Sequence, residues 1–170
     1  KEAQLVVPQN IAERVALFDL RIFSTDRHGG NGFFIGKKPF RVCLFGHELT
    51  LPPWQHLGEA RFEAWQAWPQ LHTPPSKFAQ EVVRYEVERK EFSVSILTSL
   101  GIDSASITTY QIMLLVLEIA VLEYNMPLGR IADKVMHEYF GDDASTSWLE
   151  DLVKQASEIA NPDMDQFHFL

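Results

Sequence analysis

Residues 19–31 read DLRIFSTDRHGGN, and this short stretch carries most of what the sequence predicts about fold and function. Asp26 and Asn31 stand five positions apart in it, on either side of Gly29 and Gly30. Glycines permit backbone angles that other residues avoid, so we expect the segment to form a loop. Aspartate and asparagine often stabilise turns with their side chains, so the pair has a structural interpretation as well as a chemical one.

The spacing of Asp26 and Asn31 also matches a chemical requirement. Phosphoryl transfer uses a carboxylate to orient the attacking hydroxyl group and an amide oxygen to help hold a metal ion. Protein kinases place these two residues in the pattern H-R-D-x-x-x-x-N, with the same separation. The stretch therefore predicts a loop of the kind that carries phosphotransfer chemistry.

The surrounding residues extend this match to one family. Residues 18–33 read FDLRIFSTDRHGGNGF, residues 44–52 read LFGHELTLP, and residues 59–70 read EARFEAWQAWPQ. These blocks resemble the C-terminal lobe of the phosphatidylinositol 3- and 4-kinases, and the likeness is closest to the plant-type gamma phosphatidylinositol 4-kinases. That branch reads L-D-x-R-I-F-N-x-D-R-H-x-G-N-I-L, then a hairpin, then P-I-D-H-G-L-x-L-P and a tryptophan-rich stretch ending W-P-Q. The likeness fades to helix pattern alone by about Tyr139.

The resemblance implies a role for each polar residue around the loop. It implies a catalytic group and a cofactor-binding group: Asp26, Arg27 and His28 for catalysis, and Asn31, His47 and Glu48 for the cofactor, with Asn31 as the metal ligand. The two histidines are expected to be mainly structural, because the family's loop histidine packs and hydrogen-bonds to hold the loop. A zinc site of the two histidines and Asp26 is an alternative, since imidazole and carboxylate both bind zinc, although no helical i, i+4 spacing supports it.

One departure from the family pattern bears on activity. Alignment on His47 and on residues 49–52 puts Gly46 where the family has the aspartate that binds the metal bridging the ATP phosphates. Glycine has no side-chain ligand atom, and its presence removes the principal metal carboxylate. Electrostatic stabilisation of the transition state dominates phosphoryl transfer, so this loss predicts inactivity. Glu48 is the nearest carboxylate and would replace it only in a remodelled loop.

Few residues precede the predicted loop. The nucleotide-binding lobe of a kinase lies before the catalytic loop and carries a phosphate-covering loop and a strand lysine. Lys1 is the only lysine before Lys37, and no glycine-rich run precedes Asp26. We therefore expect the C-terminal lobe alone, with the N-terminal lobe absent. The chain begins with Lys1 rather than methionine, which is compatible with a fragment, with a processed organelle-targeted precursor, or with a lobe that was never needed.

Composition narrows the class of partner. The chain has 170 residues, of which 46% are hydrophobic, enough for one buried core. Its net charge of −8 argues against nucleic acid, which needs a basic footprint, and against docking on anionic lipid surfaces. Cys43 is the only cysteine, so no internal disulfide or cysteine-based metal centre can form. The most apolar run, residues 112–122, is interrupted by Glu118 and is too short for a membrane span, so we expect no transmembrane segment.

The expected fold is mainly α with one small β-hairpin, as in the C-terminal lobe of a kinase-like fold. We expect one domain over residues 1–160 and an irregular tail over residues 161–170. Apolar spacing and capping residues predict helices, and turn residues between β-branched and aromatic runs predict a hairpin. The predicted helices cover residues 8–23, 54–68, 76–89, 92–100, 103–124, 127–140 and 145–160, and the predicted strands cover residues 33–35 and 41–45, joined by a turn at 36–39.

Two functions remain open at this point. In the first, the chain is a degenerate kinase lobe, a pseudokinase that needs no cofactor and serves as a structural or protein-binding subunit. In the second, it is the C-terminal half of an active lipid or protein kinase that transfers the γ-phosphate of Mg-ATP to a hydroxyl group, with a lipid head group as one substrate. The glycine at position 46 and the acidic charge favour the first. An intracellular location is expected, with the compartment open.

Overall fold

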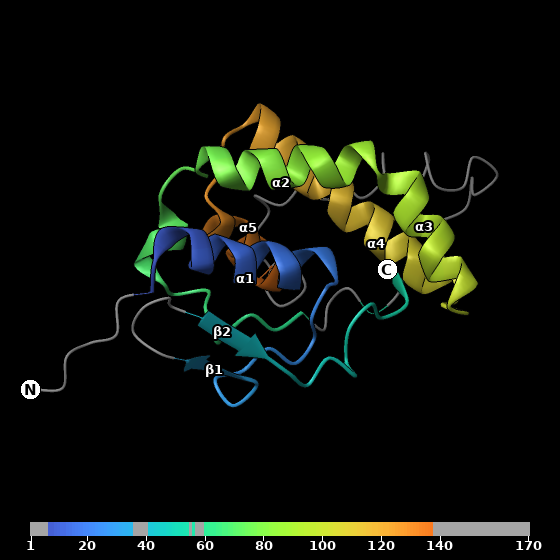
Figure 1. Cartoon of the computed structure of the whole chain (residues 1–170), viewed down its shortest axis with the longest axis horizontal. Coiled ribbons are helices and arrows are strands. Elements are labelled where there is room, and N and C mark those ends of the chain that lie inside the picture. Colours follow the sequence, from blue (N-terminus) through green and yellow to red (C-terminus); the bar gives the residue numbers. More distant parts are fainter. Residues whose placement is uncertain (1–6, 36–40, 55, 57–59, 138–170) are drawn as a thin grey trace, which may run out of the picture.

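The computed structural model describes residues 7–35, 41–54, 56 and 60–137, and these residues are mainly helical with one two-stranded sheet (Figure 1). The predicted hairpin turn at 36–39, the predicted helix over 145–160 and the tail lie outside the described residues. The elements in chain order are α1 (Gln9–Arg21), β1 (Gly32–Ile35), β2 (Arg41–Leu44), the 3₁₀ helix η2 (Pro69–His72), α2 (Lys77–Glu88), α3 (Lys90–Ser99), α4 (Ser104–Leu117), the π-helix η3 (Glu118–Glu123) and α5 (Leu128–His137).

Helix α1 is the centre of the fold. It contacts α2, α4, α5 and η2, and Figure 1 shows it between α2 and the hairpin. Pro8 precedes its first turn, and its carbonyl accepts a hydrogen bond from the Ala12 amide at 3.0 Å. Ala12, Ala16 and Leu20 recur at helical spacing and are fully buried. The buried helix α1 ends at Arg21, and the loop that contains Asp26 follows it directly.

The other helices follow from capping residues and apolar spacing. The Ser76 side chain accepts a hydrogen bond from the Ala79 amide at the start of α2, and the Asp103 side chain accepts one from the Ser106 amide at the start of α4. Gly101 follows α3 with φ of +79°, a backbone angle that favours glycine, as the sequence predicts. α4 continues into η3, where the Tyr124 amide donates to the Ile119 carbonyl, so the predicted helix to residue 124 is present with a wider last turn.

Residues 104–123, which form α4 and η3, are long and apolar enough to cross a membrane by length and composition alone. However, 67% of this apolar stretch is buried inside the protein. Its side chains pack against α1, α2 and α3, as those of a core helix do. The stretch is weak evidence for a membrane span.

The hairpin is antiparallel and short. Gly32 pairs with Leu44 and Ile35 pairs with Arg41 at its two ends. Val42 and Leu44 of β2 pack against the core, whereas the side chains of β1 are largely exposed. A two-stranded ribbon is marginal alone, so its position depends on this packing and on the loop that precedes it.

The predicted helix over 54–68 is wrong for its described residues after position 60, which form turns and extended chain. Turn hydrogen bonds join some of their backbone groups, and others bond to the loop around Asp26. The Arg61 amide donates to Ser24, the Arg27 amide donates to Arg61, and the Ala64 amide donates to Arg27, at 3.1–3.2 Å. These tertiary hydrogen bonds take the place of a helical ladder, and Trp65 lies fully buried in the core.

Candidate functional site

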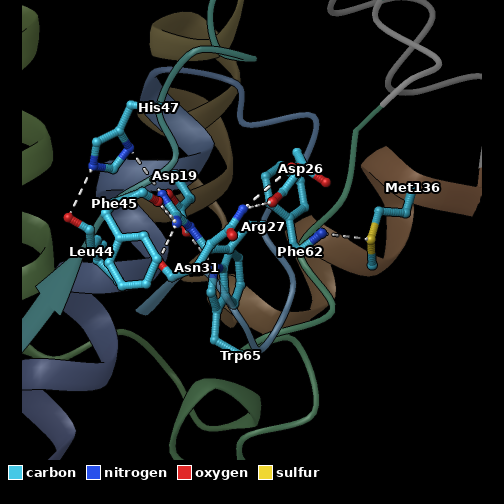
Figure 2. Close-up of polar contacts among 10 residues, drawn as sticks. All are labelled: Asp19, Asp26, Arg27, Asn31, Leu44, Phe45, His47, Phe62, Trp65 and Met136. Carbon is cyan, nitrogen blue, oxygen red and sulfur yellow. Dashed lines mark hydrogen bonds and ion pairs between the residues drawn. The ribbon is translucent and has the colours of Figure 1, made fainter. Parts of the chain in front are cut away.

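The guanidinium group of Arg27 joins the loop to the rest of the fold (Figure 2). Arg27 is 1% exposed, and its Nε donates to Oδ2 of Asp19 at 2.9 Å. Its Nη1 donates to the carbonyl oxygens of Asn31 and Phe45, both at 2.8 Å, and its Nη2 lies 3.1 Å from Nδ1 of His47. One side chain thus connects α1, the loop and the exit of the hairpin.

Asp19 is the buried counter-charge of Arg27. It lies in the last turns of α1 and is completely buried. The indole Nε1 of Trp65 donates to the same Oδ2 atom at 2.7 Å, while Oδ1 has no hydrogen-bond partner among the described residues. Burial raises the pKa of Asp19 above its ordinary value, and the hydrogen bonds and charge of Arg27 offset this only in part.

From the sequence, Asp19 and Trp65 have no predicted part in the site, and Arg27 is assigned to the catalytic group. In the structure Arg27 is buried, and its guanidinium group supports the loop. A signal for Asp19 exists in the sequence, since it falls at helical spacing on the apolar face formed by Ala12 and Ala16. A charged residue on such a face needs a buried partner.

The loop brings Asp26 and Asn31 together, as their spacing predicts. Nδ2 of Asn31 donates to the Asp26 carbonyl oxygen at 2.6 Å and lies 3.3 Å from its Oδ2. The Asp26 side chain is 44% exposed, and Nε2 of His28 lies 3.9 Å from its Oδ2. The Gly30 amide donates to Nδ1 of His28, which holds the ring against the loop. The Asp26 carboxylate is therefore oriented by Asn31 and is open to solvent.

Gly46 lies directly against Asn31. The Phe45 amide donates to the Asn31 carbonyl oxygen at 3.1 Å, which brings the hairpin exit onto the loop. A Cβ atom added at Gly46 would lie 3.0 Å from Nδ2 of Asn31, and the residue has φ of +68°. Gly46, at the position where the resembled family carries an aspartate, thus adjoins Asn31, but it presents backbone only.

His47 is tied to Arg27 and not to a metal group. Arginine has no acceptor, so Nδ1 of His47 accepts from Arg27, and Nε2 donates to the Leu44 carbonyl at 3.3 Å. The Phe18 ring packs edge-on against the imidazole, with ring centroids 5.3 Å apart. The zinc alternative is not supported, because the described residues contain no cluster of three or more His, Cys, Asp or Glu side chains able to hold a metal.

The donors at the hairpin exit do not fit a magnesium ion bridging ATP phosphates. Magnesium is bound through one or two carboxylates and by oxygen ligands in octahedral geometry. Asn31 offers one amide oxygen, and Gly46 offers no side-chain atom. Glu48 is exposed, and within the described part of the chain no hydrogen bond joins it to Asn31 or Asp26.

By sequence similarity the chain is kinase-related. In particular, over 86 residues, 46% of the chain, it is 40% identical to phosphatidylinositol 4-kinase gamma 7 of Arabidopsis thaliana. Over 168 residues, 98% of the chain, it is 24% identical to phosphatidylinositol 4-kinase gamma 4 of the same plant. The chain spans 12% and 28% of the lengths of these two curated relatives. No protein-family model matches the chain, and no solved structure matches it.

Proposed function

We propose that this chain is a degenerate lobe of the phosphatidylinositol 3- and 4-kinase type, a pseudokinase that acts as a structural or protein-interaction subunit. The observation that carries the proposal is Gly46, which adjoins Asn31 where the resembled family has its metal carboxylate. The partial similarity to phosphatidylinositol 4-kinases supports the kinase ancestry. The chemistry of the loop supports the loss of activity.

The physical argument rests on charge. Phosphoryl transfer involves little covalent chemistry for the protein, so positioning and electrostatic stabilisation supply almost all of the catalysis. A metal ion neutralises the charge that develops on the phosphates, and a carboxylate must hold that ion. Asn31 is neutral and Gly46 is bare, so Asp26 is the carboxylate beside Asn31, and the position of the family's metal aspartate carries no charge.

A role in protein interaction is supported by apolar side chains at the surface. Large contiguous apolar patches are rare on monomeric proteins and often mark interaction sites. No residue of α3 is buried, and large apolar side chains are exposed around it. A second exposed set lies on and after the hairpin. The exposed residues are Tyr85, Phe92, Ile96 and Leu100 near α3, and Phe33, Phe34, Ile35, Phe45 and Leu49 near the hairpin.

The test is phosphotransfer by the purified protein and by its Asp26→Asn variant. Both are incubated with radiolabelled Mg-ATP and vesicles containing phosphatidylinositol, and with a generic protein acceptor in parallel. The proposal predicts no transfer above background for either protein. Thermal unfolding of both proteins provides the control for folding.

The alternative is an active kinase lobe, and one observation favours it. The Asp26 carboxylate is 44% exposed and oriented by Asn31, as a base that positions an acceptor hydroxyl group would be. Transfer by the wild type that Asp26→Asn abolishes would establish this alternative and overturn the pseudokinase proposal.

A further inference from the structure

A cavity of about 360 Å³ lies between α1, α2 and α4, apart from the donors around Asn31. Its wall is mostly apolar and includes Leu17 of α1, Val83 of α2, and Leu114 and Leu117 of α4. Ligand cavities commonly measure roughly 300–1,000 Å³ and are lined mainly by hydrophobic side chains. The volume and lining are therefore those of a site for an apolar group.

Two arginines of α1 border this cavity. Arg14 and Arg21 are seven residues apart, about two helical turns, and so lie on one side of the helix. Arg21 is ion-paired with Glu86 of α2. Arg14 is exposed, with its guanidinium carbon 4.9 Å from the centroid of the Phe78 ring. No carboxylate is ion-paired with Arg14 among the residues that the structure describes.

The charge at the cavity is therefore opposite to that of the chain. The chain as a whole carries a net charge of −8, but Arg14, Arg21 and Glu86 leave one positive charge beside an apolar wall. The guanidinium group matches the planar geometry of carboxylate and phosphate oxygens, and its carbon lies over the Phe78 ring. A positive group above an apolar cavity is complementary to a molecule with an anionic head and an apolar tail.

We propose that this cavity binds a single-chain amphiphile with an anionic head group. Arg14 contacts the head group, and the tail lies against Leu17, Val83, Leu114 and Leu117. A nucleotide fits poorly, because the wall offers few polar groups to pair with a base or a ribose. This proposal rests on the cavity alone and holds whether or not the loop around Asp26 is active.

The proposal is tested by calorimetry on the purified protein with three probes that share a ten-carbon chain: decanoate, decyl phosphate and decanol. Decanoate and decyl phosphate are used below their critical micelle concentrations, and decanol is used below its solubility limit in water. We expect saturable binding of at least one anion, and binding of decanol at least about fivefold weaker, because only the anions pair with Arg14. The tighter of the two anions identifies the head group as carboxylate or phosphate. Shortening the better anion by one methylene should weaken binding by up to about fourfold.

Variants locate the site. Arg14→Gln should weaken the binding of the two anions by about five- to twentyfold and leave the binding of decanol unchanged. Arg84→Gln is the matched control, since Arg84 is an exposed arginine of α2 outside the cavity wall. Val82→Phe, which narrows the cavity, should weaken the binding of all three probes. The proposal is overturned if no probe binds saturably, if decanol binds as tightly as the anions, or if Arg14→Gln and Arg84→Gln behave alike.

Discussion

The loop around Arg27 and the surface of α3 depart in opposite ways from the usual division between polar exterior and apolar interior. Arg27 and Asp19 are charged side chains with 1% and 0% exposure, respectively. On α3, by contrast, no residue is buried, and Phe92 and Ile96 face solvent. Burial of charges without partners is costly, and exposure of apolar side chains forgoes the gain of burial. The first region has charges that internal contacts satisfy, whereas the second leaves apolar side chains exposed to solvent.

Hydrogen bonds within the loop region offset the free-energy cost of burying Arg27 and Asp19. The Arg27 guanidinium donates to Asp19, Asn31, Phe45 and His47, so each of its three nitrogens has a partner. Buried ion pairs are seldom net stabilising, but they fix one arrangement of the segments that they join. The cluster thus holds the loop and the hairpin exit together. Gly46 therefore lies beside Asn31, although it offers no side-chain ligand to a metal.

Removal of Arg27 is the change with the largest expected effect. Arg27→Met should lower the free energy of unfolding by about 3–5 kcal/mol, because it leaves Asp19 buried without a counter-charge. Chemical denaturation measures this directly, and Arg84→Met, an exposed arginine replaced in the same way, should have little effect. A loss as small as that of Arg84→Met would show that the buried pair is not essential to the fold.

The second expected effect is a pH dependence from Asp19. Burial raises the pKa of this carboxyl above its ordinary value near 3.8, so the folded chain binds the proton more readily than the unfolded chain. As the pH rises from the ordinary pKa through the raised pKa, the contribution of Asp19 to the free energy of unfolding therefore decreases. Asp19→Asn cannot titrate, so the difference between the wild type and this variant should decrease from pH 4 upward. A difference that grows with pH would mean that Arg27 lowers the pKa below its ordinary value.

The smallest effect is expected on α3. Ile96 is 41% exposed, so Ile96→Ala should change the free energy of unfolding by less than about 0.5 kcal/mol. Ile112 of α4 is 2% exposed, and Ile112→Ala is the matched buried change, with an expected loss of about 2–5 kcal/mol. Equal losses for the two variants in the purified chain would show that the α3 surface is already covered.

The sequence was most informative where signals are local. The structure brings Asp26 and Asn31 together, and the caps at Ser76 and Asp103 each act within a few residues at the start of a helix. The sequence was least informative where contacts are distant. The Asp19 and Trp65 hydrogen bond joins residues 46 positions apart, and no local pattern encodes it.

The turns at residues 60–68 show the same limit. Their tryptophan spacing resembles that of an amphipathic helix, but their backbone groups bond to Ser24 and Arg27 across the fold. Tertiary hydrogen bonds override local preference at such places. Gly46 and Asn31, in contrast, lie next to the two paired strands, and the pairing of Gly32 with Leu44 brings them together.

The central claim is that the loop lacks a metal site because position 46 carries no carboxylate. The direct measurement is the broadening of the Asn31 side-chain amide NMR signals by Mn²⁺, in the wild type and in Gly46→Asp, with Gly46→Asn as the control of equal size. The account predicts no selective broadening in the wild type or in Gly46→Asn, and selective broadening in Gly46→Asp. Selective broadening at Asn31 in the wild type at submillimolar Mn²⁺ would contradict it.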